Sequence, residues 1–215
     1  MPMENIQNNL SILKENIPEK ITLVAVSKTK SENEILQAYE TGQRIFGENK
    51  IQEMASKFEA LPKDIEWHMI GQVQTNKVKY MAPFVHMIHA VDRLKLLKEI
   101  QKQALKNNRI IECLIQVRIS EEETKSGIPS WELESLLEYA NSFSNVKIKG
   151  LMGMASFTTN KKQIRNEFKL LANLFKCHPE LQVLSMGMSG DYLMAIEEGS
   201  NMIRVGSNIF GERNY

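Results

Sequence analysis

The stretch Ile21-Thr-Leu-Val-Ala-Val-Ser-Lys-Thr-Lys30 decides how this chain folds. Its apolar and β-branched residues run without polar alternation, which is typical of a strand buried on both faces of a parallel sheet. The run ends on Ser27 and Lys28. In α/β folds the carboxyl ends of parallel strands border the active-site crevice, and apolar walls reduce the preference of an amine for its charged form. Lys28 could therefore attack a carbonyl, although from this stretch alone a solvated lysine in a surface turn is the simpler interpretation.

Along the rest of the chain, short apolar runs alternate with segments whose apolar residues recur at helical spacing. Short apolar runs predict further strands at 44–46, 66–70, 84–89, 110–117, 146–151, 182–185 and 201–205. Apolar residues at helical spacing predict a helix from about Met3 to Asn16 and others around 31–42, 51–61, 76–80, 92–104, 133–140, 164–175 and 191–198. Each strand but the last is followed by a helix.

Two helix starts carry recognisable capping residues. Ser31 with Glu34 three positions later forms a capping-box signature, and Asp92 is expected to cap the long helix that follows it. The eight strands and their helices predict a single (β/α)₈ barrel spanning residues 1–215, with an extra N-terminal helix. The alternative is an open doubly wound sheet of fewer strands, which is weakened because the first turn has no Walker-type or dinucleotide glycine motif.

Composition excludes several classes of protein. The 215 residues are 42% hydrophobic and 25% charged with a formal net charge of +1, so we expect neither a nucleic-acid nor a membrane partner. The first residues do not form a basic segment followed by an apolar one, and Cys113 and Cys177 are too few and too far apart for a disulfide framework or metal cluster. We therefore expect a cytoplasmic protein.

In a barrel all strand ends gather on one face, so residues far apart in sequence become neighbours. On this ground we expect the following to meet: Lys28, Asn49, His68, Ser189 and Arg204. The loops after the seventh and eighth strands are a frequent phosphate site of this fold. Here they are Met186-Gly-Met-Ser-Gly-Asp191 and Gly206-Ser-Asn208, with Ser189 expected at a helix start. Glycine N–H groups and serine hydroxyls suit an anion, although two ordinary capped turns would look the same.

Arg204 interrupts an apolar strand, Met-Ile-Arg-Val-Gly206. A buried unpaired guanidinium is costly, so it needs an acceptor, which is either a structural carboxylate or a heterocyclic ring nitrogen. A Schiff-base lysine, a phosphate site and a ring-nitrogen partner are together what pyridoxal 5′-phosphate requires.

Nearly the whole chain resembles the YggS/PROSC family of pyridoxal-phosphate-binding homeostasis proteins and, more distantly, the barrel domain of alanine racemase. The segments that carry the resemblance are Ala25-Val-Ser-Lys-Thr29, Phe46-Gly-Glu-Asn49, Gln52-Glu53, Trp67-His-Met-Ile-Gly71, Gln74-Thr-Asn-Lys77, Leu184-Ser-Met-Gly-Met-Ser189 with Asp191, Ala195-Ile196, Gly199-Ser200, and Val205-Gly-Ser207 with Phe210-Gly211.

The resemblance implies a role for each site residue. Lys28 would form the internal aldimine, Ser189, Gly206 and Ser207 would hold the phosphate, and Arg204 would face the pyridine nitrogen. Asn49, which ends the second matching segment, is assigned to the same cofactor site.

Four positions depart from the family pattern. Lys50 stands where tyrosine is usual and Arg118 where asparagine is frequent, and both are interpreted as solvated charges at the rim of the site. Ser207 and Asn201 stand where threonine is common, and Ser207 keeps the hydroxyl.

The histidines give weaker signals. His68 could line the pocket or be hydrogen-bonded at a strand end. His86 and His89 have no carboxylate or cysteine close to them in the sequence, so we expect no metal site.

The resemblance leaves two classes of function. The first is a non-catalytic monomer that takes part in vitamin B6 homeostasis, holding pyridoxal phosphate and delivering it to apoenzymes or buffering it. The alternative is a racemase-like enzyme acting on amino acids. The first is favoured because the chain ends at Tyr215, before any second domain that could supply an opposing base, and because Arg204 would weaken the cofactor as an electron sink.

Overall fold

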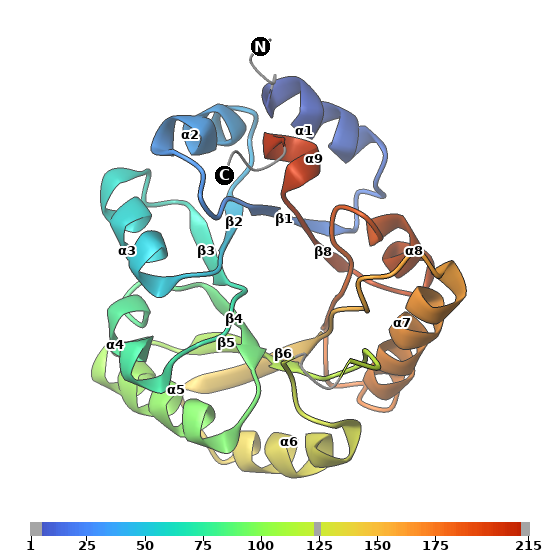
Figure 1. Ribbon diagram of the computed structural model, residues 1–215. Helices are drawn as coiled ribbons and strands as arrows, with labels where there is room; N and C mark the ends of the chain where they lie inside the picture. The colour runs from blue at the N-terminus through green and yellow to red at the C-terminus, as the bar shows by residue number, and fades with distance from the viewer. Residues whose placement is uncertain (1–5, 123–125, 212–215) are drawn as a thin grey trace.

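The computed structural model describes residues 6–122 and 126–211, which form a closed barrel of parallel strands (Figure 1). Each strand pairs with the next in sequence, and β8 closes on β1. The strands are β1 (Thr22–Val26), β2 (Ile45–Glu48), β3 (Glu66–Met69), β4 (Met87–Val91), β5 (Ile111–Gln116), β6 (Val146–Met152), β7 (Val183–Ser185) and β8 (Met202–Val205). The predicted (β/α)₈ barrel is confirmed.

Helices surround the barrel (Figure 1). They are α1 (Ile6–Glu15), α2 (Glu32–Glu40), α3 (Ile51–Ala60), the 3₁₀ helix η1 (Thr75–Lys77), α4 (Val78–Met81), α5 (Leu94–Lys106), the 3₁₀ helix η2 (Ser130–Glu132), α6 (Leu133–Asn141), α7 (Lys161–Lys176), α8 (Tyr192–Glu197) and α9 (Ser207–Phe210). The extra N-terminal helix is confirmed as α1, which packs against α2 and α9; residues 1–5 lie outside the described part of the chain. None of the described helices combines the length and apolar character that crossing a bilayer requires.

Of the two helix caps predicted from the sequence, one is confirmed and the other is wrong. The capping box is confirmed, since the Ser31 side chain accepts from Glu34 N while the Glu34 carboxylate accepts from Ser31 N. The predicted Asp92 cap is wrong: α5 has Arg93 at its N-cap without a side-chain cap, and Asp92 instead pairs with that arginine. The eighth strand, expected to lack a helix, is followed by α9.

The fourth strand begins three residues later than predicted. Phe84 N and Val85 N both bond to Met81 O, so this apolar segment still completes the turn that ends α4. A short apolar run does not distinguish the end of a helix from a strand, because both are buried.

The core has an inner and an outer layer. The outer layer, between strands and helices, contains large apolar residues such as Phe46, Trp67 and Phe168. A smaller apolar group fills part of the barrel interior: Val24, Met87, Ala90, Leu114, Met152 and Met202. The interior also holds a polar series, described below, that bears on function.

Candidate cofactor site

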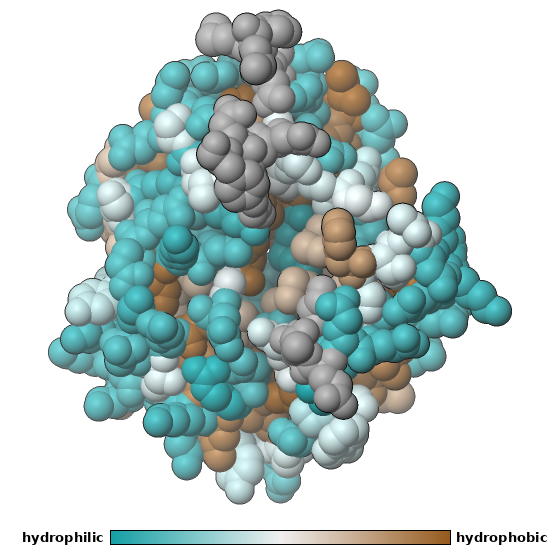
Figure 2. Space-filling model, in the orientation of Figure 1, coloured by the Kyte–Doolittle hydropathy of each residue, from teal (hydrophilic) through white to brown (hydrophobic). Residues whose placement is uncertain are grey.

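A cavity of about 580 Å³ opens at the carboxyl ends of the strands. Such a volume suits a small organic ligand. All six residues that the sequence assigned to a cofactor line it: Lys28, Asn49, Ser189, Arg204, Gly206 and Ser207. The face of the barrel in Figure 2 is largely hydrophilic, with a hollow near its centre. The topology therefore brings together side chains that are up to 179 positions apart, counting from Lys28 to Ser207.

Lys28 lies in a tight turn just beyond β1. Ser27 N continues the ladder by donating to Gly47 O (3.0 Å), and Lys30 N closes the turn on Ser27 O (3.0 Å). Thr29 occupies the left-handed region with φ 66°, which is unfavourable for a β-branched residue. This strained conformation directs the chain so that the half-buried Lys28 lines the cavity.

An ion-pair network that the sequence analysis did not find holds this turn. The Lys57 amine donates to Ser27 O, Glu48 Oε1 and Glu53 Oε1, each at 2.8 Å. Glu48 also accepts from Ser27 Oγ (2.6 Å), and Glu53 accepts from Thr29 N (2.6 Å). Both neighbours of Lys28 are thus fixed by groups from β2 and α3, which compensates for the backbone strain.

Glu48 is the most deeply buried charged group of this network, since its side chain is fully buried. Burial raises the pKa of the Glu48 carboxyl, and Lys57 and Ser27 partly oppose that shift. Within the described part of the chain, Glu48 Oε2 has no hydrogen-bond partner. Lys57 is thus the cation that compensates the buried Glu48 carboxylate.

Lys30 also lines the cavity, but its amine is engaged elsewhere. The Lys30 amine donates to Phe210 O (2.7 Å) and pairs with Glu34 (3.2 Å), so it ties the β1 turn to α9. Lys50 is the exposed N-cap of α3, and neither it nor Arg118 lines the cavity.

Asn49 reaches the cavity from the end of β2. A Cβ added to Gly71 would lie 2.4 Å from Asn49 O, so only glycine allows the loop after β3 to pack against this residue.

The two loops expected to bind an anion do meet. Gly206 N donates to Ser189 Oγ (3.2 Å), which joins the loop after β7 to the loop after β8. Ser207 is the first residue of α9, so its N–H has no acceptor within the helix. Ser189 is not at a helix start as expected, because α8 begins at Tyr192 with Asp191 at its N-cap. Ser189 thus presents its hydroxyl from a loop.

The two glycines of these loops differ in the space around them. A Cβ on Gly190 would meet nothing within 4 Å, whereas a Cβ on Gly206 would lie 3.2 Å from Val26 O. Glycine at 206 therefore lets the loop approach β1 closely, and its N–H donates to Ser189 Oγ at the wall of the cavity.

Arg204 extends from β8 into the barrel interior and is almost fully buried. It donates from Nη1 to Ser185 Oγ (2.7 Å) and from Nη2 to Gly153 O (3.1 Å), both neutral acceptors. Burial lowers the pKa of Arg204 to about 10, and the nearby Asp191 carboxylate opposes that shift. Arg204 therefore remains a cation at neutral pH and borders the cavity as a donor only.

His68 does not join the cavity as expected. It is buried deeper in the barrel, where its Nδ1 lies 2.9 Å from His89 Nε2. His89 Nδ1 lies 3.3 Å from Ser185 Oγ. Burial lowers the pKa of His68 to about 3 and that of His89 well below its usual value, so both rings are neutral.

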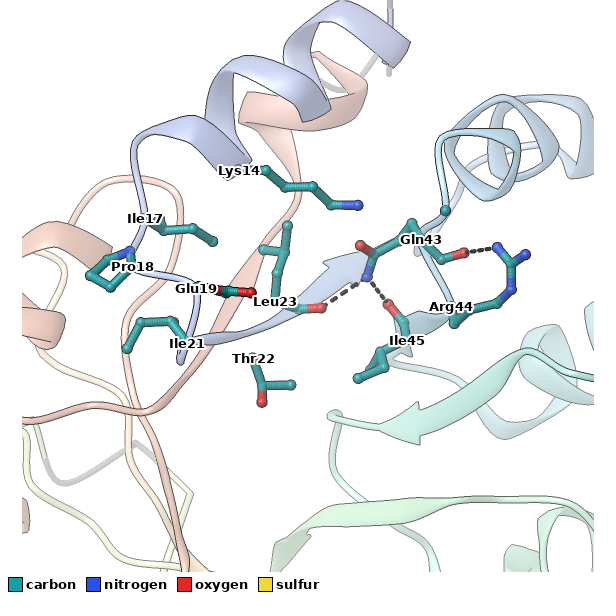
Figure 3. Close-up of a pocket in the computed structure, with 11 residues that line it drawn as sticks. Lys14, Ile17, Pro18, Glu19, Ile21, Thr22, Leu23, Gln43, Arg44 and Ile45 are labelled. Carbon is teal, nitrogen blue, oxygen red and sulfur yellow. Dashed lines mark hydrogen bonds between the residues drawn. The ribbon is translucent and has the colours of Figure 1, made fainter.

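A second cavity, of about 510 Å³, lies at the opposite end of the barrel (Figure 3). Lys14 of α1 points towards it, and Gln43 Nε2 donates to Leu23 O and Ile45 O beside it. It is formed at the amino-terminal ends of β1 and β2, so it contains none of the residues gathered around Lys28.

These features define a class of protein: a (β/α)₈ barrel with a lysine after the first strand, loops rich in glycine and serine after the last two strands, and a buried arginine on the eighth strand. Such a site can hold a small anionic carbonyl compound, because the amine, the hydroxyl and N–H donors, and the cation line one cavity.

Comparisons with known proteins agree with this class. The family model "Alanine racemase, N-terminal domain" matches residues 2–214. The pyridoxal phosphate homeostasis protein of Aquifex aeolicus is 43% identical over 199 residues, covering 90% of this chain and 87% of its own. The structure of PipY from Synechococcus elongatus with pyridoxal phosphate bound has a TM-score of 0.86 at 32% identity, over 96% of this chain and all of its own.

Alanine racemase from E. faecalis matches with a TM-score of 0.78 over 98% of this chain and 58% of its own. At 17% identity, that similarity concerns the fold alone. This chain belongs to the family of pyridoxal phosphate homeostasis proteins.

Proposed function

We propose that this protein binds pyridoxal 5′-phosphate and serves its homeostasis by holding the cofactor on Lys28 and buffering it or delivering it to apoenzymes. The observation that carries the proposal is that Lys28 and the loops after β7 and β8 line the same cavity. The names of its relatives and the cofactor-bound PipY structure support it.

Each residue has a defined task in this proposal. The Lys28 amine adds to the aldehyde carbon of the cofactor and water leaves, which gives a reversible Schiff base. Ser189, Ser207 and the backbone at Gly206 bind the phosphate, and charge-assisted hydrogen bonds of this type are stronger than neutral ones. Asn49 borders the ligand from the β2 side.

Arg204 is assigned to the pyridine nitrogen. Pyridoxal phosphate supplies an electron sink to enzymes that transform amino acids, and the sink is strongest when its ring nitrogen is protonated. The Arg204 guanidinium is a permanent donor, so it disfavours a proton at that nitrogen. We therefore propose a non-catalytic carrier, and a racemase-like enzyme is the alternative.

We propose a single-domain monomer acting in the cytoplasm. One chain supplies all six site residues, so binding requires no second subunit. Cys113 and Cys177 are both free, which supports a reducing compartment.

Reductive labelling tests the assignment of Lys28. Borohydride treatment of the cofactor-loaded protein, followed by peptide mass analysis, should place the label on Lys28. Lys28→Ala should abolish labelling, while the matched control Lys50→Ala, at an exposed position away from the cavity, should keep it. A label on Lys30, Lys50 or Lys77 would overturn the assignment.

Isotope exchange separates the carrier from the enzyme. The loaded protein is incubated with L-alanine and other L-amino acids in deuterated water, and α-hydrogen exchange and chirality are followed. We expect no turnover at rates typical of enzymes, about 1 per second or faster. Turnover at such rates that Lys28→Ala abolishes would favour the racemase-like alternative.

A further inference from the structure

Three ionisable side chains meet at the end of the barrel opposite to Lys28. Glu66 begins β3, His68 follows two positions later on the same face, and His86 immediately precedes β4. One potential ligand atom from each lies within 4.8 Å of the other two, and Glu66 Oε2 is 3.5 Å from His86 Nε2. The fold thus supplies a carboxylate beside His86, which has none close to it in the sequence.

The buried member of this cluster has an unused ligand atom. His68 is almost fully buried, and its Nε2 has no hydrogen-bond partner among residues 6–122 and 126–211. The cofactor proposal gives this nitrogen no task. A buried polar atom without a partner is uncommon in folded proteins, and binding of an ion is one of its ordinary explanations.

The other nitrogen of His68 is already fixed in the way that metal-binding histidines require. If His68 Nδ1 carries the proton, it donates to His89 Nε2 at 2.9 Å and leaves the Nε2 lone pair free for a cation. His89 then carries its own proton on Nδ1, 3.3 Å from Ser185 Oγ. Such a second hydrogen bond orients a ligand imidazole and raises its basicity.

We propose that Glu66, His68 and His86 bind a divalent transition-metal ion, with Zn²⁺ as the best fit. Two imidazoles and one carboxylate suit zinc better than magnesium or calcium, which prefer oxygen ligands. Water completes the coordination, because the Glu66 and His86 side chains are 44% and 43% exposed. This site is independent of the cofactor proposal.

One side chain must move for the ion to bind. The rings of His68 and His86 are nearly parallel, at 5° with their centroids 5.5 Å apart, so their lone pairs do not yet converge. His86 is half-exposed and bonds only loosely to Glu66, so it can turn, while His68 stays fixed by His89.

Calorimetric titration of the chelator-treated full chain with Zn²⁺ tests the site. We expect one equivalent to bind, and Glu66→Gln and His86→Ala each to weaken it at least about tenfold. Both positions are half-exposed, so the variants should fold, which circular dichroism checks. Absence of binding to the wild type, or unchanged binding to His86→Ala, would overturn the proposal.

A matched control excludes the most obvious competing site. Cys177 is exposed, and the adjacent His178 lies 3.3 Å from Glu134 and 3.4 Å from Glu180. The double variant Cys177→Ser/His178→Ala should bind Zn²⁺ as tightly as the wild type. Loss of the single equivalent in this variant would place the ion there and refute the assignment.

Imidazole nitrogen NMR provides a readout that a merely structural role would not change. The chain has four histidines, so each ring can be assigned by substitution. Zn²⁺ should shift the Nε2 signal of His68 and a ring signal of His86, leaving His178 unchanged. A shift confined to His178 would contradict the proposal.

Discussion

Substitution of Lys57 by methionine tests the network that holds the Lys28 turn. Lys57 donates to Ser27 O, Glu48 and Glu53, and its side chain is only 8% exposed. Methionine keeps most of the volume and removes the charge, so Glu48 is left buried without a cation. Breaking a buried pair in this way typically costs about 3–5 kcal/mol of unfolding free energy.

The loss of unfolding free energy in Lys57→Met should depend on pH, because a Glu48 carboxyl that takes up a proton no longer buries an unpaired charge. Its folded pKa is already raised above the usual 4.5 by burial, so the folded state binds more protons than the unfolded state between these two pKa values. The contribution of Glu48 to the free energy of unfolding therefore falls as pH rises through that window and is constant above it. Without Lys57 the pKa of the folded Glu48 carboxyl rises further, because the cation that stabilises its ionised form is gone.

Urea unfolding of the wild type and Lys57→Met, followed by circular dichroism at several pH values, measures this. We expect the full loss of about 3–5 kcal/mol near pH 8 and a clearly smaller loss near pH 5. Adding Glu48→Gln should restore most of the stability at high pH, because it removes the unpaired charge. A loss below about 1 kcal/mol at pH 8, or one that does not change between the two pH values, would refute the reasoning.

Two further predictions concern stability, and a third concerns ligand affinity. Gly150→Ala should destabilise the protein by at least about 2 kcal/mol, because the added Cβ would lie 1.7 Å from Val183 O. The control Gly190→Ala should change stability by less than about 0.5 kcal/mol, because its Cβ would meet nothing within 4 Å. Equal urea midpoints for the two variants would contradict this. Ser27→Ala removes the 2.6 Å hydrogen bond to Glu48 and should cost about 1.5–3 kcal/mol by the same assay, against a small effect for the exposed Ser135→Ala. Pyridoxal should bind at least about 100-fold more weakly than its phosphate in a spectroscopic titration. Ser207→Ala should reduce the difference between the two affinities. Equal affinities in the wild type would remove the loops after β7 and β8 from the proposal.

The sequence predicted the fold because its decisive signals are local. Runs such as Ile110 to Val117 are apolar throughout, as strands buried on both faces must be, and β5 occupies Ile111–Gln116. The same rule predicted where Lys28, Ser189 and Arg204 would meet, since strand order in a barrel follows chain order. The prediction was wrong where a turn and a strand share one apolar pattern, as at Phe84 and Val85, whose N–H groups bond to Met81 O in the turn after α4.

Side-chain networks could not be predicted in the same way. Glu48, Glu53 and Lys57 lie within or beside a matching segment, yet their contacts to Ser27 and Thr29 depend on how α3 packs against β1. The Glu53–Lys57 spacing is that of an i,i+4 pair, which on a surface helix would suggest only a solvated contact. Their burial, which the sequence does not reveal, turns that pair into a support for the turn.

The same limit applied to the barrel interior, and here it connects the two ends of the molecule. The interior of such a barrel is usually filled by branched apolar residues, but here Arg204, Ser185, His89 and His68 form a continuous series of polar contacts. Buried polar groups are costly unless satisfied, and each link in this series satisfies its neighbour. At one end of the series Arg204 borders the Lys28 cavity, and at the other His68 Nε2, which has no hydrogen-bond partner in the described part of the chain, lies near Glu66 and His86. A cofactor ring nitrogen at one end and a metal ion at the other would complete the series, so both proposals account for polar groups that packing alone does not explain.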